Sequence, residues 1–181
     1  PLASSYQDCC DIVAAFNKSK LPLFVAYYRR SLPRFLKVKS LLEQGRIGNV
    51  RHIQWLLTKP ANALDLSKKY NWRTDKEIAY GGYFDDLASH GLDLFNYLLG
   101  DINKAIGIAT NQQGLYSGCD AITASWTHEN GVTGSGCWNF GSSERADKVE
   151  IIGSEGKLTF SIFDEAPIQL IALNRKEEFI I

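Results

Sequence analysis

Residues 121–140 read AITASWTHENGVTGSGCWNF. Strand-forming residues alternate with small or polar ones on both sides of Glu129-Asn130-Gly131, a pattern typical of strands with one buried and one exposed face. Glu129-Asn130-Gly131 is a strong hairpin signal, because an Asn-Gly pair between two alternating runs favours a tight turn. The stretch therefore predicts two antiparallel neighbouring strands, over Ala121–Thr127 and Thr133–Phe140.

The rest of the chain places this hairpin in a larger pattern. Further strand-like runs, separated by turn residues, are Leu23–Tyr28, Val50–Thr58, Ile102–Thr110, Lys148–Ile152, Lys157–Ile162 and Ile168–Leu173. Helical patterns run from a cap at Ser4 or Ser5 to about Ser19, over Pro33–Gln44, and from Asp85 to about Leu99. Helices followed by hairpin strands predict one α+β domain over residues 1–181, with a mostly antiparallel open sheet and helices packed on one face.

Composition excludes several classes of partner. The 181 residues carry no net charge, with 20 Lys and Arg against 20 Asp and Glu, so nothing favours nucleic acid or an anionic membrane. No apolar run approaches the roughly 18 residues of a membrane span, and no stretch resembles a signal peptide. The four cysteines form no CxxC pair, so we expect no metal site and a reducing, cytoplasmic location.

The sequence from Gly81 to Asp93 carries the main candidate for chemistry. A diglycine leads into a helix with Asp86 and His90 four residues apart, a spacing that places both side chains on one helix face. An acid and an imidazole side by side are suited to moving a proton. The bland alternative is that Asp86 complements the positive end of its helix and His90 is a hydrogen-bonded core residue. Asp93 is interpreted as structural.

The long segment Lys59–Ala79 has no sustained helical or strand period. Loops of this length inside compact domains are usually functional or mobile. Because this one ends at the diglycine, we expect it to border the site.

Several motifs follow one another in a characteristic order. They are Val25-Ala26-Tyr27-Tyr28-Arg29-Arg30, Leu42-Glu43-Gln44-Gly45-Arg46-Ile47-Gly48, Asn71-Trp72-Arg73, the diglycine with Asp86 and His90, and Val149-Glu150-Ile151-Ile152-Gly153-Ser154-Glu155-Gly156. In order and spacing they resemble the C-terminal domain of the Gfo/Idh/MocA oxidoreductases, the glucose-fructose oxidoreductase and inositol dehydrogenase family. This resemblance implies a domain like the C-terminal domain of glyceraldehyde-3-phosphate dehydrogenase.

The resemblance also implies an activity and a set of site residues. It implies an NAD- or NADP-dependent oxidoreductase acting on a hydroxyl or carbonyl of a sugar or polyol. In that reading His90 is the general base, and Asp86 binds a substrate hydroxyl or biases the imidazole toward its charged form. Trp72 and Arg73 supply a stacking face and a hydrogen-bond donor to the same substrate.

The resemblance further assigns Tyr28 and Arg29 to the substrate, at the end of the strand that contains them. Family members begin with a dinucleotide-binding domain, but this chain holds no Gly-x-Gly-x-x-Gly turn for the pyrophosphate. The resemblance implies that the cofactor domain, with a catalytic lysine in a Glu-Lys-Pro motif, precedes Pro1. We therefore assign no cofactor-binding residue here and expect residues 1–181 alone to bind no cofactor and to be inactive.

The predicted sheet suggests how copies of the protein associate. The face bearing Trp126, Trp138 and Phe140 is expected to be an exposed apolar patch, and such patches usually mark interfaces. By resemblance, family members pair through this face, so a homodimer or higher oligomer is expected. The alternative function is a non-catalytic ligand-binding or dimerisation module of the same fold.

Overall fold

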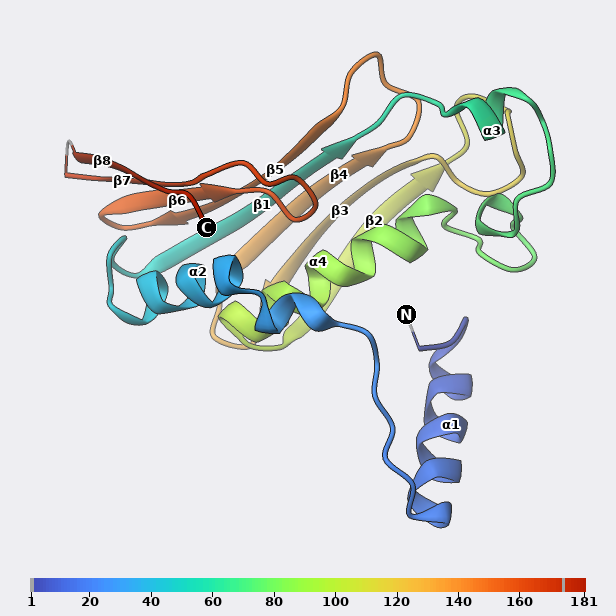
Figure 1. Cartoon of the computed structure of the whole chain (residues 1–181), viewed down its shortest axis with the longest axis horizontal. Coiled ribbons are helices and arrows are strands. Elements are labelled where there is room, and N and C mark those ends of the chain that lie inside the picture. The colour runs from blue at the N-terminus through green and yellow to red at the C-terminus, as the bar shows by residue number, and fades with distance from the viewer. Residues whose placement is uncertain (1, 174) are drawn as a thin grey trace.

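A single sheet contains all eight strands of the computed structural model, which describes residues 2–173 and 175–181 (Figure 1). The strands are β1 (Val50–Thr58), β2 (Ile102–Thr110), β3 (Ala121–His128), β4 (Thr133–Asn139), β5 (Ala146–Gly153), β6 (Gly156–Phe160), β7 (Ile168–Ala172) and β8 (Arg175–Phe179). Their order is β2-β3-β4-β1-β5-β6-β7-β8, with β1 parallel to β4 and every other pair antiparallel. The predicted α+β class and mostly antiparallel open sheet are confirmed.

The helices of the described residues lie mainly before the hairpins, as predicted. They are α1 (Tyr6–Ser19), α2 (Pro33–Glu43), α3 (Ala63–Leu66), α4 (Tyr83–Leu99) and the short 3-10 helices η1 (Tyr28–Ser31) and η2 (Trp72–Thr74). Ser5 caps α1 by accepting the backbone N–H of Asp8. In the described part of the chain, no helix combines the length and apolar character that crossing a membrane requires.

The core lies between the sheet and the helices α2 and α4. Phe95 of α4 packs edge-on against Trp55 at 5.7 Å between ring centres, and Phe35 of α2 packs against Phe160 at 6.1 Å. Gly91 lets α4 approach the sheet closely, because a Cβ at this position would lie 2.4 Å from the indole of Trp55. Large aromatic rings therefore fill the space between the two layers.

The prediction that Trp126, Trp138 and Phe140 form an exposed face is wrong. They are 4 %, 0 % and 2 % exposed, because these side chains point toward α4 and not away from it. Phe84 of α4 packs on Trp138 at 4.9 Å, and Phe95 stacks on Trp126 at 6.2 Å. Alternation along a strand separates two faces but does not tell which one the helices will cover.

The opposite face of the sheet is open and mixed in character. Its centre is polar: His52 lies within hydrogen-bond distance of the hydroxyls of Thr133 and Ser135, and Glu150 accepts from the amide of Gln54. Apolar side chains flank this centre, with Ile106 and Ile108 of β2 and Leu56 of β1 being 78 %, 69 % and 40 % exposed.

The N-terminal segment does not join this core. No residue of α1 is buried, although its sequence has an apolar face, and Figure 1 shows the helix standing apart from the sheet. The predicted strand Leu23–Tyr28 is wrong: residues 21–27 are irregular and Tyr28 begins η1. A strand needs a hydrogen-bonding neighbour, and none of the described strands pairs with this segment. Phe24 is consequently 88 % exposed.

Candidate active site

A cleft of about 740 Å³ opens beside the first half of α4, between η2 and the extended residues 25–27. Its walls include Trp72, Arg73, Asp86 and His90, four of the six site residues expected from the sequence. The structure thus brings side chains from the loop before α4 and from α4 itself to one place. Tyr28 and Arg29 are not among the lining residues.

The start of α4 is set by the diglycine. Gly82 has φ 60° and ψ −135°, a conformation that is accessible essentially to glycine alone. A Cβ at this position would also lie 2.4 Å from the carbonyl oxygen of Cys119. The carboxylate of Asp85 accepts the backbone N–H of Gly81 at 2.9 Å, which closes the turn. This turn fixes where Asp86 and His90 project.

The loop before α4 is tied to the same helix through one phenol. The Tyr83 hydroxyl donates to the carboxylate of Asp65 at 2.7 Å and accepts from the side-chain amides of Asn62 and Asn71 at 2.8 and 3.0 Å. Asn71 also caps η2 by accepting the backbone N–H of Arg73. The predicted loop Lys59–Ala79 borders the cleft as expected, and the phenol holds it in place.

Asp86 is paired with Arg73 across the cleft. The Arg73 Nε donates to the Asp86 carboxylate at 3.2 Å, and the guanidinium lies 4.4 Å above the indole ring of Trp72. Both members of the ion pair are more than two-fifths exposed, so the pair contributes little to stability. Their polar atoms are accordingly available to a ligand in the cleft.

Within residues 2–173 and 175–181, no side chain or backbone group forms a hydrogen bond with the His90 imidazole. Its Nδ1 is buried and has no partner among the described residues, and its ring meets Tyr27 and Tyr28 edge-on at 5.7 and 6.2 Å. Burial lowers the pKa of His90, and the positive charge of Arg29 lowers it further. Asp86 acts in the opposite direction but does not outweigh these causes. Asp86 thus biases the imidazole toward its charged form, as expected, but burial and Arg29 outweigh this effect and the net shift of the His90 pKa is downward.

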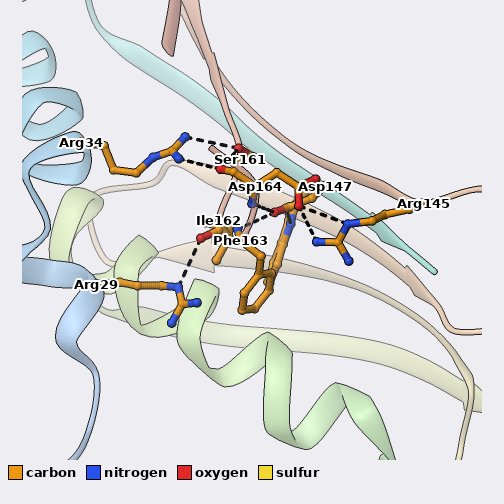
Figure 2. A network of polar contacts seen from close by, with 9 residues as sticks. Arg29, Arg34, Arg145, Asp147, Ser161, Ile162, Phe163 and Asp164 are labelled. Atoms are coloured by element: carbon orange, nitrogen blue, oxygen red, sulfur yellow. Dashed lines mark hydrogen bonds and ion pairs between the residues drawn. The ribbon is translucent and has the colours of Figure 1, made fainter. Parts of the chain in front are cut away.

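Arg29 lies behind the cleft wall. Its side chain is buried, with 7 % of the residue exposed, and its Nε donates to the carbonyl of Ile162 at 3.3 Å (Figure 2). Tyr28, its neighbour in η1, is 56 % exposed. The burial of Arg29 cannot be predicted from the Tyr28-Arg29-Arg30 segment, because the loop that covers Arg29 lies more than 130 residues later in the chain.

Sequence reasoning did not single out some of the lining residues. These are chiefly Tyr27, Lys76, Tyr80 and Ser89. Ser89 precedes His90 directly and Tyr27 precedes Tyr28, so adjacency to named residues was the available signal. In residues 2–173 and 175–181 no group of three or more His, Cys, Asp or Glu side chains is placed to hold a metal ion.

Comparison with known proteins gives a consistent result. Residues 35–159 match the model of the GFO/IDH/MocA C-terminal domain. The chain is 34 % identical over 164 residues to "Oxidoreductase P35" of Formosa agariphila, covering 90 % of this chain and 50 % of that protein. It is 28 % identical over 168 residues to D-apiose dehydrogenase of Paraburkholderia graminis, covering 89 % and 43 %.

Solved structures show the same fold. An oxidoreductase from Agrobacterium radiobacter, in complex with NAD+, L-tartaric acid and magnesium, superposes with a TM-score of 0.81 at 19 % identity, covering 99 % of this chain and 52 % of that one. Levoglucosan dehydrogenase in complex with NADH and levoglucosan gives 0.70 at 22 % identity, covering 89 % and 47 %. The chain spans about half the length of these relatives. From the match over residues 35–159 and the identity to a curated oxidoreductase, the chain belongs to the GFO/IDH/MocA family.

Proposed function

We propose that this chain is the substrate-binding and catalytic half of an NAD- or NADP-dependent oxidoreductase acting on a hydroxyl or carbonyl of a sugar or polyol. The observation that carries the proposal is the convergence of His90, Asp86, Arg73 and Trp72 on one cleft of about 740 Å³. Relatives that act on small carbohydrates, such as D-apiose dehydrogenase, support this substrate class.

The cleft suits an uncharged substrate. Its two basic side chains, Arg73 and Lys76, each lie within 4 Å of a carboxylate, that of Asp86 and that of Glu77. A carboxylate or phosphate on the substrate would have to break such a pair, whereas a hydroxyl can donate to Asp86 and accept from Arg73. The indole of Trp72 beside them offers an apolar face for a sugar ring.

His90 is assigned the proton transfer. Its lowered pKa keeps the imidazole neutral at pH 7, which is the form that accepts a proton from a substrate hydroxyl. The rings of Tyr27 and Tyr28 pack edge-on against the imidazole. When the substrate is instead a carbonyl compound, the protonated imidazole returns the proton.

The cleft also has surface that fits a nicotinamide ring. Ile78, Phe84 and Leu92 are apolar residues of its lining and would contact the ring. NAD(P), when bound, accepts or donates the hydride. We assign its phosphates to a preceding dinucleotide-binding domain, and we expect residues 1–181 alone to be inactive. Ala3 and Ser4 line the cleft, so a lysine shortly before them in a longer chain would be delivered to it.

The test uses the full-length protein with NAD(P) and a panel of neutral sugars and polyols. We expect His90→Gln to lower kcat by about 10²- to 10⁴-fold while leaving cofactor affinity unchanged. The matched control is His52→Gln, a histidine on the open sheet face, which should retain activity. Wild-type turnover in the His90→Gln variant would remove His90 from the mechanism.

A structural role accompanies the catalytic one. We propose that two copies pair through the open sheet face, where Ile106, Ile108 and Leu56 surround the polar centre. The proposal keeps the expected homo-oligomer but assigns its interface to these residues and not to Trp126, Trp138 and Phe140. A non-catalytic dimerisation module of the same fold is the alternative, and it predicts association without turnover in the full-length protein.

Because the four cysteines are free thiols, we also propose a reducing, cytoplasmic location.

A further inference from the structure

Arg29 is a buried cation without a carboxylate partner among the described residues. Only 7 % of the residue is exposed, its Nε donates to one carbonyl, that of Ile162, and its buried Nη1 has no partner in this part of the chain. A charge in this setting is costly, because protein atoms replace water without fully satisfying the guanidinium. The fold alone gives little reason to keep an arginine at this position.

The loop after β6 holds the Arg29 guanidinium in place. The Asp147 carboxylate accepts the backbone N–H groups of Phe163 and Asp164, and this fixes the loop (Figure 2). The phenyl ring of Phe163 then lies 4.5 Å from the guanidinium carbon of Arg29. A cation over an aromatic face with a carbonyl at its edge has little freedom to move.

Tyr28 connects this buried cation to His90. The guanidinium carbon of Arg29 lies 5.0 Å from the ring centre of Tyr28, and the imidazole of His90 lies 6.2 Å from the same ring on its edge. The Tyr28 ring therefore lies close to both groups. Because the guanidinium of Arg29 is buried, its charge is screened less than a charge on the surface.

The two carboxylates near His90 are each paired with an arginine, and the amino group of the chain's first residue is a third cause, after burial and Arg29, that lowers the pKa of His90. On α4, Asp93 forms an ion pair with Arg30 of η1, and Asp86 forms one with Arg73. The phenol of Tyr27 on the extended segment is neutral at pH 7, and burial raises its pKa further from that pH. Arg29 is thus a buried side-chain cation near His90 that no carboxylate of the described residues pairs with.

We propose that Arg29 is a positioning residue for His90, whose buried guanidinium keeps the imidazole in the neutral form that accepts a proton. The inference rests on the proposed function for its catalytic meaning, but the electrostatic effect itself is a property of this chain. The direction of the pKa shift at His90, with Arg29 as its second cause after burial, agrees with the geometry.

The experiment is a nuclear magnetic resonance titration of the histidine rings, which needs no cofactor or substrate. In Arg29→Gln and Arg29→Met we expect the midpoint of His90 to move to higher pH, and in Arg29→Lys to stay near the wild-type value. Arg29→Met keeps an apolar stem against Phe163 and introduces no unpaired polar group, so it remains informative where the glutamine variant fails to fold.

The matched control is Arg34→Gln. Arg34 donates to the carbonyls of Asp164 and Ala166 in the same loop, so its loss loosens the loop without removing the charge beside His90. The midpoint of His90 should not move in this variant, and that of His52 should not move in any of them. An unchanged His90 midpoint in the neutral Arg29 variants, or equal shifts in Arg34→Gln, overturns the proposal.

A second readout separates this inference from the proposed function. In the full-length enzyme the acidic limb of the pH profile of kcat/KM should move to higher pH in Arg29→Met, with partial rescue by Arg29→Lys. If the titration shows the shift but the limb does not depend on His90, the charge effect stands and the assigned mechanism fails.

Discussion

Replacing Gly82 by alanine tests how the diglycine builds the site. Gly82 has φ 60° and ψ −135°, and a Cβ there would lie 2.4 Å from the carbonyl oxygen of Cys119. That carbonyl cannot move freely, because Cys119 is buried and its N–H is bonded to the carbonyl of Tyr80 at 2.9 Å. The variant must therefore either strain the turn or displace the start of α4.

The expected loss of unfolding free energy is the sum of two costs. A non-glycine residue in a sparsely populated backbone region costs about 1–3 kcal/mol. Forcing an extra carbon into a packed position costs about 1–3 kcal/mol more. We therefore expect Gly82→Ala to lower the free energy of unfolding by about 4 kcal/mol.

Urea unfolding of the chain at pH 7 measures this loss, with Gly45→Ala as the matched control. Gly45 has a similar φ of 66°, but a Cβ there meets nothing within 4 Å, so its cost should be only about 1 kcal/mol. Equal losses in the two variants would refute the reasoning, because they would show that the contact with Cys119 contributes nothing. A displaced α4 should also change the resonances of His90.

Two further predictions concern the open sheet face. Glu150, whose side chain is 11 % exposed, accepts from Lys157, Gln54 and Lys148, which lowers its pKa from 4.5 to about 2. That change is equivalent to at most about 3 kcal/mol of stability. Because the pKa of Glu150 is lower in the folded state, this stabilisation is complete above pH 4.5 and disappears as the pH falls through 2. Both lysines are partly solvated, so we expect the stabilisation to be about 2 kcal/mol. Urea unfolding at several pH values should show this loss in the wild type and not in Glu150→Gln, and parallel curves would contradict it. In sedimentation velocity, Ile108→Asp should lower the sedimentation coefficient toward that of a monomer, whereas the control Leu66→Asp should leave it unchanged. Unchanged association of the Ile108→Asp variant would count against pairing through this face.

The strands were largely readable from sequence because turn residues and alternation are local signals. The hairpin over residues 121–140 forms as predicted, with Ala121–Thr127 paired to Thr133–Asn139. The strand Arg175–Phe179 was missed, because its sequence RKEEF has no apolar alternation and its pairing with β7 stabilises it. Leu23–Tyr28 failed in the opposite way, since its strand-forming residues find no partner strand among the described residues.

Part of the candidate site was also predictable from local sequence signals. The spacing of Asp86 and His90, one helical turn apart after a diglycine, was sufficient to place both on one cleft, because helix geometry relates residues four apart. Their catalytic roles stay predictions.

Only the tertiary structure decided what surrounds them. The pairing of Arg73 with Asp86, the burial of Arg29 under a loop from beyond residue 160, and the face of the sheet that α4 covers all join segments distant in the chain. A linear sequence sets what each segment can form, but charge compensation and burial depend on which distant atoms arrive beside it. For that reason the sequence was sufficient to predict the helix face on which His90 lies, but not the direction of the shift in its pKa.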